Sequence, residues 1–307
     1  MSRVNADYLL IKAKNYEREG NFSSAEKLYS KILKSFPYNY RAKSKLEKIK
    51  SNLIENFNSE LLSSYNKGNF QEVIEKSEKL TMQFPDKINF WNLLGCANIG
   101  LGAYDKAYDA FSTASKLSPN NFNIINNLAF SLQEQGKLDL AVELYEKVIL
   151  LKPDYVEVYN AISRILKQQG KFIQAVDICK KAISINPNFS SLYNMLGSIY
   201  IDQENINESI NYLKKAIEID PEYADANYNL GVAYQYKKIF EEAEYYYKKA
   251  INYNPNMIGP LINLGYILYE QGQIERAIAY YRKAINLNPN FHETYYNLGF
   301  LLFEQHM

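Results

Sequence analysis

Seven prolines recur at one fixed spacing along this chain. Each lies 34 residues after the one before it, at Pro85, Pro119, Pro153, Pro187, Pro221, Pro255 and Pro289. A period in this range is typical of a solenoid, in which each unit buries its apolar face only against its neighbours. The spacing therefore predicts a stack of repeated helical units along the 307 residues, and not two separate globular domains.

Each unit is predicted to hold two helices joined by a short turn. A glycine marks the turn in four units, because glycine tolerates the positive φ of a helix C-terminus: Gly102, Gly136, Gly170 and Gly272. Glu204 and Lys238 take this place in two other units, so we expect their turns to be tighter or strained. The proline ends the second helix, because it has no N–H and disfavours a helical residue before it.

Small residues recur at two further positions of the unit. On the first helix they are Gly95, Ala129, Ser163, Gly197, Gly231, Gly265 and Gly299. On the second helix they are Ala107, Ala141, Ala175, Ala243 and Ala277, with Ala182, Ala216, Ala250 and Ala284 further along. Small side chains let paired helices approach closely, and large ones such as Phe111 and Tyr247 fill the remaining space.

The repeat divides the chain into three parts. Residues 1–53 hold a divergent unit, 6–39, and an insertion of 14 residues, 40–53, which contains no Gly or Pro. We therefore expect one long helix from Tyr40 to Asn66. Residues 54–291 form seven units of 34 residues, and residues 292–307 start the first helix of a further, truncated unit.

The units resemble the tetratricopeptide repeat family from about residue 6 onward, apart from the insertion. Unit 258–291 carries the full pattern in Leu264, Gly265, Gly272, Ala277, Tyr281, Ala284 and Pro289. The resemblance implies an all-α fold, a right-handed superhelical solenoid of antiparallel helix pairs. It also implies that the first helices line a concave groove and the second helices form the convex back.

Charge and composition bear on the possible partners. The net charge of +1 gives no global field that would attract nucleic acid, and no apolar run is long enough to insert into a membrane. Residues 1–53 are nevertheless basic, with 12 Lys/Arg and 5 Asp/Glu. The basic helix with Arg41, Lys43, Lys45, Lys48 and Lys50 either binds an acidic partner or a membrane surface, or is a solvated helix face. Two distant cysteines and no evident signal peptide favour a reducing, cytoplasmic location.

No catalytic arrangement is evident in the sequence. The two histidines, His292 and His306, have no cysteine or carboxylate cluster at metal-ligand spacing. Neither Cys96 nor Cys179 has a histidine nearby in the sequence, and the GxG at residues 100–102 lacks a third glycine. We therefore expect a protein that is not an enzyme and needs no cofactor or metal.

Asparagines on the first helices are the main candidates for a binding role. Four directly precede the leucine of the Leu-small pair, at Asn127, Asn229, Asn263 and Asn297, and four lie one residue earlier in the unit, at Asn92, Asn126, Asn160 and Asn194. The first set resembles the asparagine ladder of protein O-GlcNAc transferases, which implies contacts with a peptide backbone. An amide suits this role because it both donates and accepts. Alternatively, these are solvent-facing residues of an Asn-rich chain.

Other groove candidates are charged or aromatic. They are Arg164 and Lys167, one turn apart, and the stretch Tyr228, Tyr236, Tyr266, Tyr269, Phe300 and Phe303. Aromatic residues are favoured at binding surfaces, but packing between units explains each of them equally well.

The leading hypothesis is a non-catalytic scaffold that holds an extended peptide or protein segment in its groove. The alternative is that the chain is the substrate-presenting region of a larger bacterial glycosyltransferase or sulfotransferase. A third hypothesis is self-association through the apolar C-terminal helix, where Tyr295, Leu298, Leu302 and Phe303 have no second helix to cover them.

Overall fold

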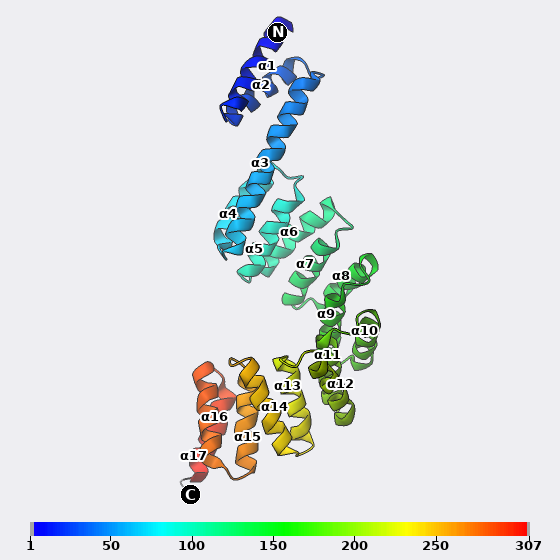
Figure 1. The fold of residues 1–307 in the computed structure, drawn as a ribbon, viewed down its shortest axis with the longest axis vertical. Coiled ribbons are helices and arrows are strands. Elements are labelled where there is room, and N and C mark those ends of the chain that lie inside the picture. The colour runs from blue at the N-terminus through cyan, green and yellow to red at the C-terminus, as the bar shows by residue number, and fades with distance from the viewer. Residues whose placement is uncertain (1–2, 306–307) are drawn as a thin grey trace. The chain divides into compact units, whose positions relative to one another are not determined.

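The computed structural model describes residues 3–305 of the chain. Residues 1–2 and 306–307, which include the second histidine and the end of the predicted terminal segment, lie outside it. The described residues form seventeen α-helices and no strand, which confirms the predicted all-α fold of paired helices (Figure 1). None of these helices combines the length and the apolar character needed to cross a membrane.

The helices fall into two compact units, and each is described separately. Unit 1 spans Met1–Gln135 and unit 2 spans Gly136–Met307. The helices of unit 1 are α1 (Arg3–Arg18), α2 (Phe22–Ser35), α3 (Tyr40–Asn66), α4 (Phe70–Gln83), α5 (Ile88–Gly100), α6 (Tyr104–Leu117) and α7 (Phe122–Glu134). The helices of unit 2 are α8 (Leu138–Leu151), α9 (Val156–Gln168), α10 (Phe172–Ile185), α11 (Ser190–Asp202), α12 (Ile206–Ile219), α13 (Ala224–Tyr236), α14 (Phe240–Tyr253), α15 (Ile258–Glu270), α16 (Ile274–Leu287) and α17 (His292–Gln305).

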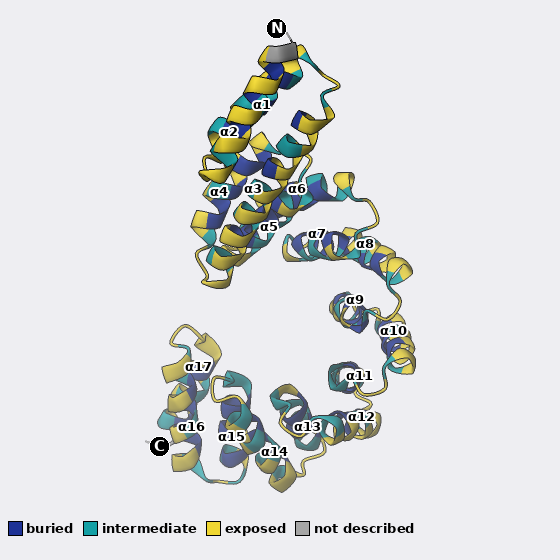
Figure 2. Ribbon diagram, turned by 45° about the horizontal axis from the view of Figure 1, so that its top comes forward, coloured by how far each residue is buried: buried dark blue, intermediate teal, exposed yellow. Residues whose placement is uncertain are grey.

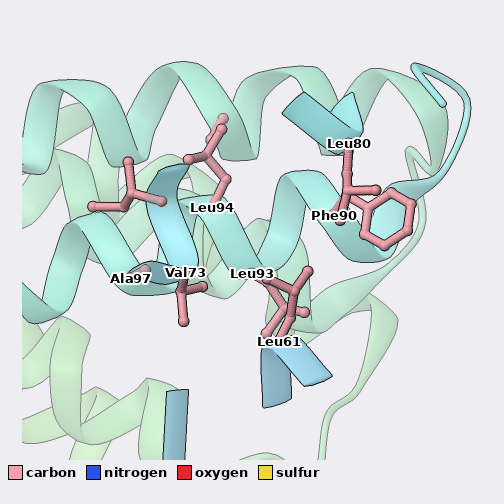
Figure 3. Packing of buried hydrophobic residues seen from close by; sticks show 9 residues of the cluster. Leu61, Val73, Leu80, Phe90, Leu93, Leu94 and Ala97 are labelled. Atoms are coloured by element: carbon pink, nitrogen blue, oxygen red, sulfur yellow. The ribbon is translucent and has the colours of Figure 1, made fainter. Parts of the chain in front are cut away.

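The long helix predicted from Tyr40 to Asn66 is present as α3, and it joins two hydrophobic clusters of unit 1. Its first half contributes Ala42 and Ile49 to a cluster with α1 and α2. Its second half contributes Leu61 to a cluster with α4 and α5. Figure 3 shows buried side chains of this second cluster: Leu61, Val73, Leu80, Phe90, Leu93, Leu94 and Ala97.

Every turn within a helix pair contains one residue with positive φ. Six are glycines, with φ between 70° and 77°. Glu204 and Lys238 adopt nearly the same conformation, with φ of 59° and 58°. These two turns also keep the backbone bond of the glycine turns, from Asn205 N to the Tyr200 carbonyl at 2.8 Å and from Ile239 N to the Tyr234 carbonyl at 3.0 Å. They are therefore strained, as expected for a residue with a Cβ, but not tighter.

The small residues of the first helices do lie against large residues of the paired second helix. A Cβ added to Gly231 would lie 2.6 Å from ring carbons of Tyr247, and Gly265 and Tyr281 have the same relation at 2.7 Å. A Cβ on Gly299 would meet nothing within 4 Å. Close packing of each helix pair therefore depends on this position.

One unit solves the same packing problem differently. Ser163 of α9 and Cys179 of α10 occupy the positions that hold glycine and tyrosine elsewhere, and both are fully buried. The Cys179 thiol donates a hydrogen bond to Ser163 Oγ at 3.2 Å, and Ser163 donates to the Tyr159 carbonyl at 2.8 Å. A larger residue on the first helix is matched by a smaller one on the second, so the pair fills similar space.

The proline that ends each second helix leaves a carbonyl to be satisfied. Three different side chains, each six residues further on, donate to it: Trp91 Nε1 to Pro85, Tyr159 OH to Pro153, and Asn227 Nδ2 to Pro221, at 2.9, 2.9 and 3.3 Å. This bond fixes the start of the next first helix relative to the preceding turn.

Candidate functional site

The candidate site lies on the first helices of unit 2. Figure 2 shows α9, α11, α13 and α15 along the inner side of this unit, with α10, α12 and α14 outside them. Consecutive first helices contact one another, α9 with α11, α11 with α13, and α13 with α15. Side chains that point between neighbouring first helices therefore meet across two successive repeats.

The two columns of asparagines hydrogen-bond to each other across repeats. Asn229 Nδ2 donates to Asn194 Oδ1 at 2.8 Å, and Asn194 Nδ2 donates to the Tyr223 hydroxyl at 3.4 Å. Within unit 1, Asn127 Nδ2 lies 3.4 Å from Asn92 Oδ1. The two columns of asparagines, which looked independent in the sequence, are therefore linked. The sequence could have indicated this, because the paired asparagines are 35 residues apart in both cases.

The remaining asparagine candidates lie apart from this arrangement. Asn160 Nδ2 donates to Ser191 Oγ at 3.3 Å, while Asn160 Oδ1 is buried without a hydrogen-bond partner. Asn126 on α7 and Asn297 on α17 are half-buried. These residues do not form one continuous row of equivalent, free amides.

A pocket of about 410 Å³ brings several of the predicted residues together. Tyr228, Asn263 and Tyr266 line it, and they come from α13 and α15. The other lining residues are Val232, Gln235, Tyr236, Lys238, Phe240 and Glu270. The pocket is thus formed where two consecutive first helices meet the turn before α14.

A buried tyrosine holds two polar walls of the pocket in place. Asn263 Nδ2 donates to the hydroxyl of Tyr247 at 3.1 Å, and this hydroxyl donates to Gln235 Oε1 at 2.5 Å. Burial raises the pKa of Tyr247 far above its usual value, so the phenol stays protonated and remains a donor. The amides of Asn263 and Gln235 are therefore oriented by a residue that lies behind the pocket.

Two exposed tyrosines and one carboxylate form the outer part of the pocket. Tyr236 and Tyr266 are 61% and 42% exposed. Glu270 lies beside Tyr266, one turn further along α15, and burial together with this carboxylate raises the Tyr266 pKa. Tyr228 is more enclosed, and burial raises its pKa as well. The pocket thus combines aromatic faces, amides and one negative charge.

Three of the predicted groove residues have structural roles or lie elsewhere. Lys167 forms an ion pair with Asp202 at 3.2 Å and donates to Ser198 Oγ at 2.6 Å. Tyr269 makes an edge contact with Phe300, with ring centroids 5.9 Å apart. Arg164 is exposed on α9 and does not line the pocket. For Tyr269, packing between repeats is therefore sufficient explanation.

Sequence reasoning missed several lining residues. Val232, Gln235 and Glu270 were not singled out, although Glu270 lies one turn after the predicted Tyr266 on the same face of α15. The sequence could have indicated these residues by helical spacing. Val232 follows Tyr228 by four residues, Gln235 follows Val232 by three, and Glu270 follows Tyr266 by four.

The described residues hold no group of three or more His, Cys, Asp or Glu placed to bind a metal ion. Burial raises the pKa of both thiols, Cys96 and Cys179, to about 11, so each is protonated near neutral pH. Such thiols are poor nucleophiles, and the pocket itself contains neither cysteine.

Comparison with protein-family models identifies the repeats. Models described as tetratricopeptide repeat match residues 98–165, 156–189, 178–211 and 224–257. A model described as TPR repeat matches residues 197–238 and 265–305. Together these matches span more than half of the chain.

Solved structures share the fold at low sequence identity. The Cut9–Hcn1 hetero-tetramer of the APC/C contains a chain that is 19% identical, with a TM-score of 0.64; the match covers 98% of the present chain and 57% of that chain. The present chain thus spans little more than half the length of that relative.

Two bacterial structures match over most of their own lengths. A tetratricopeptide repeat protein from Parabacteroides merdae is 15% identical with a TM-score of 0.59, and the match covers 97% of this chain and 98% of that one. The C-terminal part of a TPR repeat-containing protein from Cytophaga hutchinsonii is 18% identical with a TM-score of 0.58, covering 78% and 99%. These similarities establish the fold alone.

A search of the curated proteins finds no match to this sequence. The family models and the paired helices agree with each other and with the spacing of the prolines. The chain belongs to the tetratricopeptide repeat family, whose fold generally serves as a scaffold for protein interaction.

Proposed function

We propose that the inner face of unit 2 binds an extended segment of a partner protein, with the pocket between α13 and α15 at its centre. The observation that carries this proposal is the pocket of about 410 Å³, in which the amides of Asn263 and Gln235 are held by the buried Tyr247 hydroxyl. Amides that are fixed before binding lose little conformational entropy when a ligand arrives.

An extended segment suits this surface better than a folded domain. A side-chain amide offers both a donor and an acceptor, which matches the peptide group of any residue. The pocket is large enough for one side chain of the segment, and its aromatic walls supply apolar contact. Asn229 and Asn194, paired on the neighbouring first helices, offer further amide groups along the same face.

The test uses a display library of random linear peptides selected on the full chain. Peptides that are enriched would be synthesised with a fluorescent label and titrated by anisotropy. The Asn263→Ala variant should bind them about tenfold more weakly, because a bound peptide group then loses a fixed partner.

The matched control is Asn211→Ala, because Asn211 is an exposed asparagine on α12. This variant should bind as the wild type does. Enrichment of no peptide, or equal binding by the Asn263→Ala and wild-type proteins, would contradict the proposal.

A further inference from the structure

We infer that the segment bound by the pocket presents a lysine or arginine side chain, which docks between Tyr236, Tyr266 and Glu270. This inference rests on the proposed function and specifies the chemistry of the ligand. Two observations carry it: the charge of the first helices and the groups that line the outer pocket. One lysine at the pocket opposes such a ligand and supplies a test.

The first helices around the pocket lack lysine and arginine. The sequences of α11, α13, α15 and α17 contain no lysine or arginine. They do carry Asp202, Asp225, Glu270, Glu293 and Glu304. Among the residues that the structure describes, Asp202 forms an ion pair with Lys167, and the carboxylates of Asp225, Glu270 and Glu293 are exposed. This part of the inner face therefore attracts positive charge and disfavours an acidic segment.

The outer pocket has the groups that a cationic side chain needs. The exposed rings of Tyr236 and Tyr266 offer aromatic faces, and the Glu270 carboxylate lies beside Tyr266. A cation is stabilised over the face of a tyrosine ring, and more so where a carboxylate is close. On the outer helices the same chain already pairs lysines with tyrosine rings, with Lys249 Nζ 4.9 Å from the Tyr245 centroid.

One lysine lines the pocket and opposes such a ligand. Lys238 occupies the turn before α14, where six other helix pairs have glycine, and its side chain is exposed. Its charge repels an incoming cation, so removing that charge should strengthen binding. Removing the charge of Glu270 and removing that of Lys238 should therefore change the affinity for a cationic ligand in opposite directions. A merely apolar pocket would not show this.

The experiment compares three labelled peptides that share one neutral Gly/Ser/Asn sequence and differ at the central residue, which is Arg, Gln or Glu. Each is titrated against the full chain by fluorescence anisotropy at low and high salt. The Arg peptide should bind about tenfold more tightly than the Glu peptide at low salt, and the difference should shrink as salt rises.

The variants then assign the effect to the pocket. Glu270→Gln should weaken binding of the Arg peptide by about five- to tenfold, and Lys238→Gln should strengthen it by about threefold, because each changes one charge near the docked cation. Glu218→Gln, an exposed carboxylate on α12, is the matched control and should leave binding unchanged.

Two results would overturn the inference: equal or tighter binding of the Glu peptide, or unchanged binding of the Arg peptide to Glu270→Gln. Failure of this inference can be told apart from failure of the proposed function. If library peptides without Lys or Arg bind through Asn263, the groove is a peptide site of different specificity. If no peptide binds at all, both proposals fail.

Discussion

At the scale of single residues, one position on each first helix sets how closely two paired helices approach. Gly231 leaves room for the Tyr247 ring, and that ring in turn places the hydroxyl that holds Asn263 and Gln235. Packing and the candidate site are therefore linked through Tyr247. A change at Gly231 should affect the stability of the helix pair and the orientation of the pocket amides together.

The Gly231→Ala substitution should destabilise the protein by about 2 kcal/mol, because overpacking forces the ring or the backbone to move. The new Cβ would lie 2.6 Å from two carbons of the Tyr247 ring. The measurement is the midpoint of urea unfolding, followed by circular dichroism.

Gly299→Ala is the matched control for this prediction. It makes the same change in another first helix, where a Cβ meets nothing within 4 Å. Alanine is the better helix former, so this variant should gain up to about 1 kcal/mol. Equal effects of the two substitutions would show that the contact with Tyr247 does not limit the approach of α13 and α14.

At the scale of a helix pair, α9 and α10 show that two substitutions can compensate. Ser163 adds volume where glycine stands elsewhere, and Cys179 removes volume where Phe111 or a tyrosine stands elsewhere. Their hydrogen bond at 3.2 Å also satisfies two buried polar groups. The two residues should therefore act as one energetic unit, as contacting residues usually do.

Cys179→Phe alone should destabilise the pair by about 2 kcal/mol, because the ring would collide with Ser163. The double variant Ser163→Gly, Cys179→Phe should recover at least about 1 kcal/mol of this loss, because it recreates the arrangement of Gly95 and Phe111. Unfolding of the wild type, both single variants and the double variant measures the coupling. Strictly additive effects would refute the compensation.

At the scale of the whole molecule, the chain depends on buried tyrosines. It contains 28 tyrosines, and among those that the structure describes Tyr29, Tyr159 and Tyr247 are fully buried. Burial raises the pKa of Tyr281 to about 12, and it raises the pKa values of Tyr29 and Tyr247 as well. A raised pKa means that the folded protein keeps the phenol proton more firmly than the unfolded chain does.

The contribution of these buried phenols to the free energy of unfolding should be fully present below pH 10, the ordinary tyrosine pKa. It should be lost as the pH rises through 12. In this window the unfolded chain binds fewer protons than the folded one, so the free energy of unfolding decreases with pH. Thermal unfolding at stepped alkaline pH, with tyrosinate absorbance recorded in parallel, measures the effect.

The Tyr281→Phe variant removes one of these groups, and its stability should fall less steeply over the same range. A free energy of unfolding that stays constant up to pH 12 would contradict the linkage to buried tyrosines.

Two further hypotheses at this scale stay predictions. One is self-association through α17, which light scattering across a dilution series would test. The other is a role in presenting substrates to a transferase.

The backbone of this protein could be predicted well because proline and glycine act locally. The prolines ended the second helices where expected, and the absence of both residues from 40–53 predicted α3. Even the strain at Glu204 and Lys238 followed from the position of the glycines in other units.

The site could be predicted only in part because side-chain partners depend on how the helices pack. Asn263, Tyr228 and Tyr266 were candidates and do line one pocket. Their supporting residues, Gln235 and Tyr247, meet them only once α13, α14 and α15 are in place. In the same way, the sequence around Lys167 did not indicate that its side chain would form an ion pair with Asp202 of the next repeat.

The uninterrupted α3 has a mechanical consequence for unit 1. Its 27 residues extend over about 40 Å, given a rise of 1.5 Å per residue, and the two clusters it joins are separated by no turn. Other neighbouring helices of the unit are joined by turns that can absorb a twist. A twist of the α1–α2 hairpin would instead be passed toward α4 and α5 through the continuous hydrogen-bonded backbone of α3.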